Sequence, residues 1–429
     1  MNPSGSSLAD WLVRLETFSP NEIELGLERV LEVIERLEMT LPRRVFHVAG
    51  TNGKGSSVAM AEALLSEFGE TTGSYTSPHV HNFNERICID ARPASDAEIV
   101  AAFKRVEGVR GDTPLTYFEF GTIAAMLVFE ARNVDIAIFE VGMGGRLDAV
   151  NAIEPTAGLI TNVSLDHCDW LGSDVATIGF EKAGIMRAGK STVFASGDAP
   201  ASISDYATDI GAELVLAGRD YHFARSGEGW EWRGRRHVLA DLQAPSLAGE
   251  FQIANAAGVL ALLEASGCDE LLETDIVNRA LAKPVLAGRL QRVDADRCWL
   301  LDVAHNPAAA EVLAETLSTD DHKGITVAIV AMLDDKDVVG VISPLAGQID
   351  QCVAVTADSG RALDAFDLGR QIANLTNKAC FVAASLGQAI AYARQRASPD
   401  DRILVFGSFH VVGPVLEALG IYSRRKGES

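Results

Sequence analysis

The stretch "HVAGTNGKGSSVAMAEALL", residues 47–65, decides the fold. It begins in an apolar, β-rich run, passes through a glycine-rich turn and continues as a helical pattern, which is the context of a phosphate-binding loop. The glycines allow backbone N–H groups to face phosphate oxygens, and the helix N-terminus adds a favourable dipole. We expect Lys54 to reach the β- and γ-phosphates of a nucleotide. The alternative, an ordinary glycine-rich turn, is disfavoured by this lysine and the helix after it.

The residue after the lysine departs from the usual loop. In the pattern G-x-x-x-x-G-K-[ST], the hydroxyl that follows the lysine binds the magnesium ion of ATP. Here Gly55 follows Lys54, and the first glycine of the pattern would fall on Val48. Because magnesium requires oxygen ligands, we expect other residues to supply them.

Short β-rich runs alternate with helical patterns along the chain. This alternation predicts an α/β fold with mostly parallel sheets, in which ligands gather beyond the carboxyl ends of the strands. Helices are expected at 56–68, 120–131, 252–266 and 274–282, and a capping box at Ser19–Glu22 predicts one from Pro20 to Leu37. A hairpin is expected at 221–239, and the strands at 44–50, 72–77, 134–142, 157–164, 191–197, 298–307, 324–333, 352–358, 379–385 and 402–412.

The chain is long enough for two domains. We expect an N-terminal P-loop domain over residues 1–284 and a smaller, Rossmann-like α/β domain over residues 285–429. Pro284 and Gly288, in the stretch "KPVLAGRLQRV", suggest a hinge between them.

Composition narrows the class of protein. The formal charge of −22 argues against binding nucleic acid or an anionic membrane over a broad surface. Six dispersed cysteines without a C-x-x-C pair favour reduced thiols in the cytosol. The N-terminus lacks the pattern of a signal peptide, and no apolar run is long enough for a membrane span. We therefore expect a cytoplasmic protein.

Three polar residues follow predicted strands and are candidate metal ligands. Glu140 ends an apolar, buried strand, where a carboxylate needs a partner. That partner is a metal ion or, as the simpler alternative, Arg146. Ser77 ends the preceding strand, and its alternative role is a cap before Pro78. His167 follows another strand, where a lone histidine is usually structural.

Other candidates are less specific. Lys182 is either a solvated helix lysine or an amine that adds CO₂ to give an anionic carbamate ligand. In the second domain, Asp302 and His305 follow a strand and precede a helix. Arg289, in the hinge segment, is suited to a bidentate phosphate contact.

Taken together, these motifs resemble the folylpolyglutamate synthase/dihydrofolate synthase family of the Mur-ligase superfamily. The combination of "GTNGKGS", "GGRLDA" and "DVAHNP" is highly specific, and matching segments run through nearly the whole chain in family order. The other matching segments are "IELGLERV", "YTSPHV", "NERI", "LTYFEFGT", "LDHCDWLG", "EKAGIMR", "GEFQIANA", "AGRLQ", "MLDDKD" and "VFGSFH".

The resemblance implies roles for individual residues. GKGS is the normal loop in this family, and Lys54, Lys182 and His305 are the implied catalytic residues. The implied metal ligands are Ser77, Glu140, His167 and a carbamoylated (N6-carboxylated) Lys182. The implied nucleotide contacts are Thr51, Asn52, Gly53, Lys54, Gly55, Ser56, Asn255, Arg289 and Asp302. The implied pterin pocket comprises Ile23, Glu24, Leu25, Gly26, Thr116, Tyr117, Phe118, Glu119, Leu147, Asp148 and Ala149. At the glutamate end the resemblance implies His305 and Ser408.

The implied activity is ATP-dependent amide formation through an acyl phosphate. The implied substrates are dihydropteroate, reduced folates and L-glutamate, with ATP, two Mg²⁺ sites and a monovalent cation, in a monomer. Alternatives are a folylpolyglutamate synthase alone, a Mur ligase acting on a UDP-sugar peptide, and a regulatory ATP-binding protein. The sequence departs from the common family pattern at Ala287, at Phe251 and between His79 and Asn84.

Overall fold

The computed structural model describes residues 7–17, 24–197 and 199–421. The chain divides into two compact units. Unit 1 comprises the described residues up to Ser164, together with Cys168–Ser246 and Glu250–Val285. Unit 2 comprises Leu165–His167, Leu247–Gly249 and the residues from Leu286 onward.

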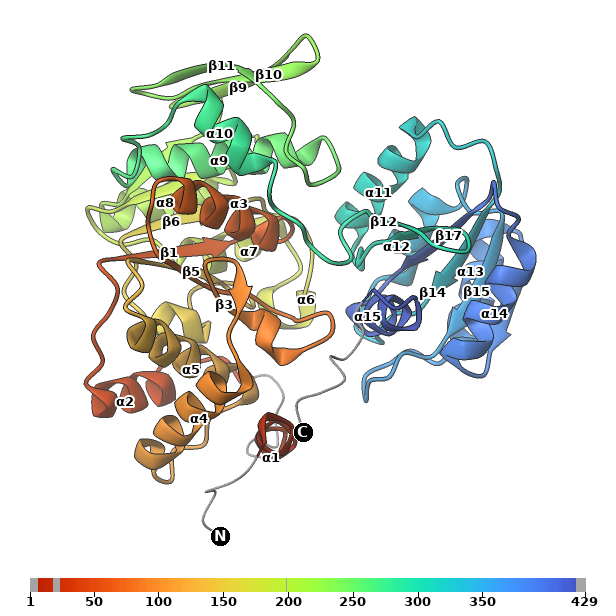
Figure 1. Ribbon diagram of the computed structural model, residues 1–429, viewed down its shortest axis with the longest axis horizontal. Helices are drawn as coiled ribbons and strands as arrows, with labels where there is room; N and C mark the ends of the chain where they lie inside the picture. Colours follow the sequence, from red (N-terminus) through yellow and green to blue (C-terminus); the bar gives the residue numbers. More distant parts are fainter. Residues whose placement is uncertain (1–6, 18–23, 198, 422–429) are drawn as a thin grey trace. The chain divides into compact units, whose positions relative to one another are not determined.

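Unit 1 is built on an eight-stranded sheet in the order β4-β3-β2-β5-β1-β6-β7-β8 (Figure 1). The neighbours in the series β2-β5-β1-β6-β7-β8 pair in parallel. Strands β3 and β4 extend the sheet beyond β2 and pair antiparallel. The strands are β1 (Arg44–Ala49), β2 (Thr72–Tyr75), β3 (Ile87–Ile89), β4 (Arg92–Pro93), β5 (Ile136–Glu140), β6 (Ala157–Ile160), β7 (Ser191–Phe194) and β8 (Glu213–Leu216).

Helices cover both faces of this sheet. Figure 1 shows α3 and α9 on one side of it and α4 and α5 on the other. The helices are α1 (Leu8–Leu15), α2 (Glu28–Leu37), α3 (Lys54–Glu67), α4 (Asp96–Arg110), α5 (Tyr117–Arg132), α6 (Cys168–Leu171), α7 (Val175–Ala183), α8 (Ala201–Ile210), α9 (Phe251–Ala265) and α10 (Thr274–Leu281), with short 3₁₀ turns η1 (Phe83–Arg86) and η2 (Ala149–Ala152).

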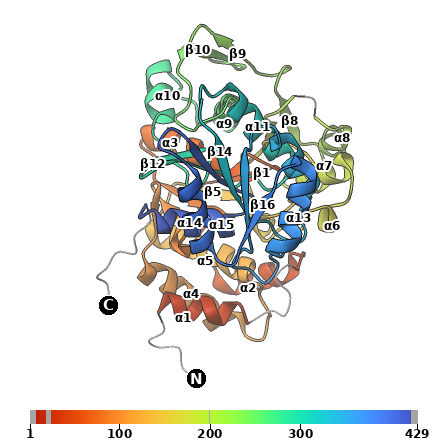
Figure 2. The ribbon, with the colours of Figure 1, turned by 90° about the vertical axis from the view of Figure 1, so that its right-hand side faces the viewer.

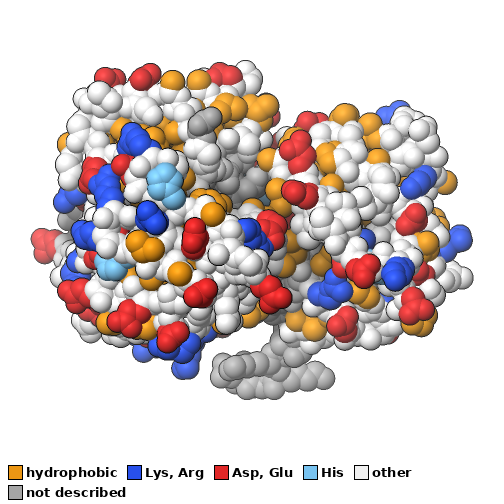
Figure 3. Space-filling view, turned by 90° about the horizontal axis from the view of Figure 1, so that it is seen from above, with side chains coloured by type: hydrophobic (Ala, Val, Ile, Leu, Met, Phe, Trp, Pro, Cys, Tyr) orange, Lys and Arg blue, Asp and Glu red, His pale blue; other side chains and the backbone are white. Residues whose placement is uncertain are grey.

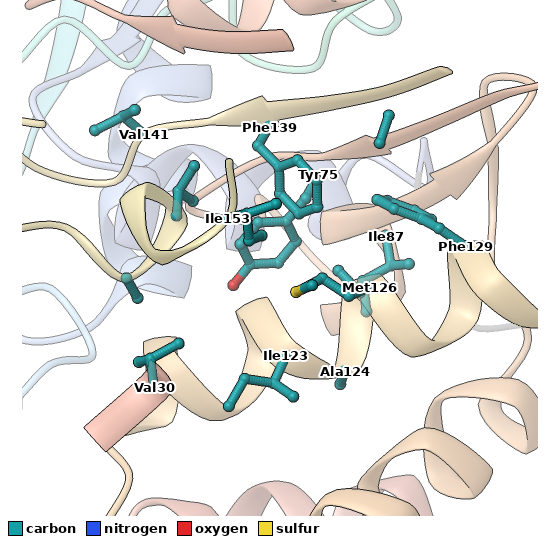
Figure 4. Close-up of a cluster of buried hydrophobic side chains, with 14 of the residues drawn as sticks. Val30, Tyr75, Ile87, Ile123, Ala124, Met126, Phe129, Phe139, Val141 and Ile153 are labelled. Atoms are coloured by element: carbon teal, nitrogen blue, oxygen red, sulfur yellow. The ribbon is translucent and has the colours of Figure 1, made fainter. Parts of the chain in front are cut away.

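The core explains why the central strands are continuously apolar. Every residue of β5 is buried, because a parallel strand covered on both faces has no solvated side. On the α5 side of the sheet, Tyr75 and Phe139 pack with Phe129 and Met126 of the helix (Figure 4). This packing fixes the strands whose carboxyl ends carry the candidate site.

A small antiparallel sheet packs against α9 in unit 1. Its strands are β9 (His222–Ser226), β10 (Gly229–Arg233) and β11 (Val238–Leu242). Trp230 and Trp232 alternate with exposed residues along β10 and are fully buried. The indole N–H of Trp232 donates to the Ala257 carbonyl at 3.1 Å, which holds the sheet to the helix.

Unit 2 has a six-stranded sheet in the order β12-β13-β17-β14-β15-β16, parallel except for β12. Its strands are β12 (Gln291–Asp294), β13 (Cys298–Leu301), β14 (Thr326–Val330), β15 (Gln351–Val355), β16 (Cys380–Ala383) and β17 (Arg402–Phe406). Its helices are α11 (Pro307–Thr319), α12 (Val338–Leu345), α13 (Ala365–Thr376), α14 (Leu386–Arg396) and α15 (Phe409–Ala418).

The α/β class and the hairpin are confirmed, and each expected strand contains an observed one. The predicted strands 298–307 and 402–412 are too long, because β13 ends at Leu301, β17 ends at Phe406 and α15 begins at Phe409. Strands β3, β4, β8 and β12 were not expected, and β11 makes the expected hairpin a three-stranded sheet. Helix α5 begins at Tyr117 instead of Phe120, because Thr116 and Glu119 form a capping box. The helix predicted from Pro20 is wrong in its start: α2 begins at Glu28, and the predicted capping box at Ser19–Glu22 lies outside the described residues. In the described part of the chain, no helix combines the length and apolar character needed to cross a bilayer.

Candidate ligase site

The glycine-rich loop joins β1 to α3 and is held to the end of β6. The Thr51 N–H donates to the Asn162 carbonyl at 3.1 Å, and the Asn52 N–H donates to the Asn162 side-chain oxygen at 3.0 Å. The Thr51 hydroxyl donates to the Ser164 carbonyl at 3.1 Å. The strand next to β1 therefore fixes the loop that the sequence predicted to cradle phosphate.

Two glycines are required by close approach within this loop. A Cβ at Gly50 would lie 1.8 Å from the Thr161 hydroxyl oxygen, at a φ of +144°. A Cβ at Gly53 would lie 2.7 Å from the Asn255 side-chain oxygen, at a φ of +84°. Only glycine combines these dihedral angles with the absence of a side chain. Gly53 is also the N-cap of α3, so the N–H groups of the first helical turn open onto the loop.

Lys54 lies over its own loop. Its ammonium group donates to the carbonyls of Gly50 and Thr51 at 3.0 and 3.1 Å. A positive charge is thus held at the turn where backbone N–H groups also converge. Such an arrangement suits the phosphates of a nucleotide.

Helix α9 contributes two buried amides to this site, one of which the sequence analysis missed. The Asn255 amide donates to the Gln252 side-chain oxygen at 3.0 Å, and the Gln252 amide donates to the Ser56 hydroxyl at 3.2 Å. Gln252 therefore connects the predicted nucleotide contact Asn255 to the first turn of α3. The signal was available, because these two amides stand three residues apart on a helix that is otherwise almost entirely buried.

Glu140 and Ser77 are brought together beside Gly55. Glu140 ends β5 and is buried, and its Oε2 accepts the Ser77 N–H at 3.1 Å. A Cβ at Gly55 would lie 3.7 Å from the same carboxylate oxygen. The alternative partner Arg146 instead forms an ion pair with Glu181 at 2.8 Å. A carboxylate and a hydroxyl are the hard oxygen donors that Mg²⁺ prefers, so these residues fit a magnesium site.

Lys182 is not a solvated helix lysine. It lies on α7 and is only 3 % exposed, so the simpler interpretation of this residue is wrong. Burying a lysine side chain is costly unless it has partners or a changed charge. The buried position is compatible with a modified, anionic side chain.

His167 lies in the short segment that belongs to unit 2. Its backbone is left-handed, with φ +50°. The adjacent Asp166 accepts from the amide of Asn306 at 2.9 Å and from the ammonium of Lys336 at 3.1 Å. Burial acts to raise the pKa of Asp166, but the positive charges of His305, His167 and Lys336 hold it well below its ordinary value. Asp166 and Lys336 were not among the predicted site residues.

The predicted pterin segments meet in unit 1. The Gly26 N–H donates to the Leu147 carbonyl at 3.1 Å. Arg29 forms ion pairs with Glu24 at 2.7 Å and with Glu119 at 2.8 Å. Segments 24–26, 116–119 and 147–149 therefore lie together, although the chain separates them widely. Of the predicted residues, Ile23 lies outside the described part of the chain.

Several of these residues also have structural roles. The Thr116 hydroxyl accepts the Glu119 N–H at 3.2 Å, and the Glu119 carboxylate accepts the Thr116 N–H at 2.7 Å. Asp148 accepts the N–H groups of Met143 and Val150 at 2.8 and 3.0 Å. Burial raises the pKa of Asp148 to about 6, against the effect of these hydrogen bonds and of the Lys54 charge.

Arg86 is a further candidate that the sequence analysis did not list. Its guanidinium lies 5.6 Å from the Phe83 ring and 5.4 Å from the ring of Tyr117, a predicted pterin contact. The Arg86 Nε donates to the His79 Nδ1 at 2.8 Å. This cation lies among aromatic rings beside the pterin segments, which favours recognition of a flat, anionic ligand.

Unit 2 brings its own predicted residues together around Asp302. The Asp302 carboxylate accepts the N–H groups of Leu290 and Ala304 at 2.8 and 2.7 Å. Burial raises the pKa of Asp302, while the nearby Arg289 charge lowers it. Arg289 also lies 5.1 Å from the Phe409 ring.

The two residues implied at the glutamate end stand at helix starts in unit 2. The ring Nδ1 of His305 lies 2.8 Å from the Val303 carbonyl, and burial lowers the pKa of His305. Ser408 caps α15, and its hydroxyl accepts the His410 N–H at 3.1 Å.

Comparison with known proteins agrees with this arrangement. Residues 48–263 match the family model of the Mur ligase middle domain, and residues 288–409 match that of the Mur ligase glutamate ligase domain. The chain is 36% identical over 425 residues to the dihydrofolate synthase/folylpolyglutamate synthase of Escherichia coli (strain K12), covering 99% of this chain and 98% of the relative.

Solved structures agree over the same span. The structure of E. coli FolC in complex with DHPP and ADP superposes with a TM-score of 0.91 at 35% identity, covering 98% of this chain and 99% of that one. A bifunctional folylpolyglutamate synthase/dihydrofolate synthase with Mn, AMPPNP and L-glutamate bound gives a TM-score of 0.89 at 39% identity, covering 97% and 99%. The chain therefore belongs to the dihydrofolate synthase/folylpolyglutamate synthase family of Mur ligases.

Proposed function

We propose that this chain is an ATP-dependent ligase that joins L-glutamate to dihydropteroate and to reduced folates, releasing ADP and phosphate. The observation that carries the proposal is the buried Glu140 carboxylate, which accepts the Ser77 N–H beside Gly55. It offers oxygen ligands where the usual phosphate loop has its hydroxyl. The relatives support the rest, since their solved structures hold ADP, DHPP, a nucleotide analogue, manganese and glutamate.

The proposed nucleotide contacts lie in both parts of the chain. In unit 1 they are the loop residues Thr51, Asn52, Gly53, Lys54, Gly55 and Ser56, with Asn255 on α9. In unit 2 they are Arg289 and Asp302. Backbone N–H groups and the Lys54 ammonium neutralise the phosphates, which is mainly an electrostatic and positioning effect.

Ser77, Glu140 and His167 are the proposed ligands of Mg²⁺, with a second Mg²⁺ site that uses a carbamate on Lys182. When bound, Mg²⁺ neutralises charge on the phosphoryl group being transferred. The buried position of Lys182 is compatible with a carbamate, whose anionic oxygen would be a ligand for the cation. We also propose a monovalent cation near the nucleotide.

The reaction proceeds through an acyl phosphate. The carboxylate of the pteroate or folate attacks the γ-phosphorus of ATP, and the bond to the β–γ bridging oxygen breaks to release ADP. The glutamate amine then attacks the acyl carbon, and phosphate leaves. Segments 23–26, 116–119 and 147–149 hold the pterin, and Arg86 lies beside them.

His305 is the proposed base for the glutamate amine. Burial lowers its pKa, which favours a neutral ring at neutral pH. The contact of Nδ1 with the Val303 carbonyl assigns the proton to Nδ1, which leaves Nε2 able to accept one. Ser408 contacts glutamate in this proposal. We assign the phosphate loop and the pterin pocket to residues 1–284. We assign glutamate, together with the nucleotide contacts Arg289 and Asp302, to residues 285–429, and the activity to a cytoplasmic monomer.

The test is ADP release by the purified protein. We expect release that requires glutamate together with dihydropteroate, and also with tetrahydrofolate. Release with tetrahydrofolate alone as acceptor would identify a folylpolyglutamate synthase without the first activity. Release that needs neither acceptor, or needs a UDP-sugar peptide, would overturn the proposal. Glu140→Gln, which keeps the shape of the side chain and removes its charge, is the inactive control.

A further inference from the structure

Two cysteines of unit 2 face each other across neighbouring strands. Cys352 on β15 and Cys380 on β16 are direct register partners in a parallel pair. Ladder partners in adjacent strands point to the same face and lie about 4.8 Å apart along the hydrogen-bonding direction. Disulfides are found at Cα separations of about 4.4–6.8 Å, so this spacing is compatible with a bond between the two sulfurs.

The two thiols share one covered face of the sheet. Helix α13 lies beside β15 and β16 (Figure 2). A Cβ at Gly369 of this helix would lie 3.7 Å from the Cys380 sulfur and 3.5 Å from the Ala354 Cβ. Because Gly369 has no side chain, the helix leaves room above the sulfur.

The pair is asymmetric in exposure and in acidity. Cys352 is 3 % exposed, whereas Cys380 is partly exposed on the edge strand of the sheet. The neighbouring Cys352 thiol lowers the pKa of Cys380. The proximity of Cys380, together with burial, raises the pKa of Cys352. Cys380 is therefore the accessible nucleophile, and Cys352 is positioned behind it.

The other four cysteines, Cys88, Cys168, Cys268 and Cys298, are not paired with a second cysteine in a strand register. Burial raises the pKa of Cys88 to about 12 and also raises the pKa values of Cys268 and Cys298. Cys168 is exposed on α6. Oxidation is therefore expected to distinguish the pair from the remaining thiols.

We propose that Cys352 and Cys380 form a redox modification site, which a disulfide oxidant such as glutathione disulfide converts into an intramolecular disulfide. The Cys380 thiolate attacks one sulfur of glutathione disulfide, forming a mixed disulfide and releasing one glutathione thiolate. Cys352 then gives up its proton to solvent, and its sulfur attacks the Cys380 sulfur and expels the second glutathione. The protein loses two electrons, and glutathione disulfide is reduced to two glutathione molecules.

The site is independent of the proposed ligase activity, because it uses no residue assigned to substrates. The bond would tie the edge strand β16 to β15 within the unit that carries His305 and Ser408. A thiol reductant would restore the dithiol.

The test uses the full chain in glutathione redox buffers, followed by alkylation and peptide mapping. We expect loss of two of the six alkylatable thiols, with a linked peptide that contains Cys352 and Cys380 and disappears on reduction. Cys168→Ser, the matched control for an exposed thiol, should keep the linked peptide, whereas Cys380→Ser should lose it.

Three outcomes would overturn the proposal. They are glutathione retained on Cys380 without linkage, disulfide-linked dimers through another cysteine, and six thiols that stay reduced. Circular dichroism of Cys380→Ser checks that this edge-strand variant is folded. If Cys380→Ser is not folded, the peptide map of the oxidised wild-type protein alone tests whether Cys352 and Cys380 are linked.

Discussion

At the scale of single residues, the phosphate loop shows how close contacts select amino acids. Gly50 and Gly53 are fixed by Thr161 and Asn255, which lie more than one hundred residues away in the sequence. The local pattern predicted the loop, because glycines, a lysine and a helix start stand next to one another. It could not predict Arg86, because the importance of this residue comes from its contacts with His79 and Tyr117.

Lys182 gives the first prediction at this scale. Lys182→Ala should lower turnover on the order of 100-fold, because a ligand of the metal site is lost. Added bicarbonate should not restore turnover, since the amine that would bind CO₂ is absent. Steady-state ADP release measures the effect, with Lys190→Ala as the matched control because Lys190 is an exposed lysine eight residues away. Wild-type turnover in Lys182→Ala would refute the carbamate.

Asp148 predicts a pH dependence of stability. Its pKa in the folded state is raised to about 6, above the ordinary value of about 4. The folded state therefore binds a proton that the unfolded state releases. This contribution is complete below pH ~4 and is lost as the pH rises through about 6; two pKa units correspond to at most about 3 kcal/mol.

Asp148→Asn should remove that contribution. The difference in unfolding free energy between wild type and variant should then change between pH 4 and pH 7, with wild type gaining relative stability toward the acidic end. Urea unfolding at several pH values measures this difference. A constant difference would mean that Asp148 has an ordinary pKa in the folded protein.

At the scale of elements, burial decides what the sequence could predict. Central strands such as β5 and β14 are mostly apolar and buried along their whole length, so the sequence pattern predicted them. The unexpected strands β3, β4, β8 and β12 are short and partly or fully exposed, and they have no such signal. Helix α5 was predicted to start at Phe120 but starts at Tyr117, three residues earlier. Its first turn belongs to the capping box of Thr116 and Glu119, which precedes the apolar run used for the prediction.

That capping box gives a prediction for α5. Thr116→Ala removes the side-chain acceptor of the Glu119 N–H and should cost about 1 kcal/mol of stability. Because Thr116 also lies in the proposed pterin pocket, its loss should raise the KM for dihydropteroate severalfold. Urea unfolding and steady-state kinetics measure the two effects.

Ser95→Ala is the matched control for that substitution. Ser95 caps α4 in the same way, is exposed and is no part of the proposed pocket. Its substitution should cost a similar free energy and leave the KM unchanged. If both variants had the same KM for dihydropteroate, Thr116 would not belong to the proposed pterin pocket.

At the scale of the whole molecule, charge governs the approach of substrates. The chain carries a formal charge of −22, and acidic and basic side chains are interspersed on the face shown in Figure 3. The composition predicted a protein without a broad affinity for polyanions, yet the proposed substrates are themselves anions. Folate polyglutamates gain one α-carboxylate with each added residue, so repulsion by the protein's net charge should grow with chain length.

This repulsion gives the last prediction. Raising ionic strength from about 0.01 M to 0.15 M shortens the Debye length from about 30 Å to about 8 Å and screens long-range repulsion. The KM for a folate triglutamate should therefore fall, and the KM for dihydropteroate, with its single carboxylate, should change less. Initial rates at fixed ATP and Mg²⁺, with potassium chloride as the added salt, measure both. A KM for the triglutamate that rises with salt would show instead that local cations such as Arg86 outweigh the net charge of the chain, because screening then removes attraction.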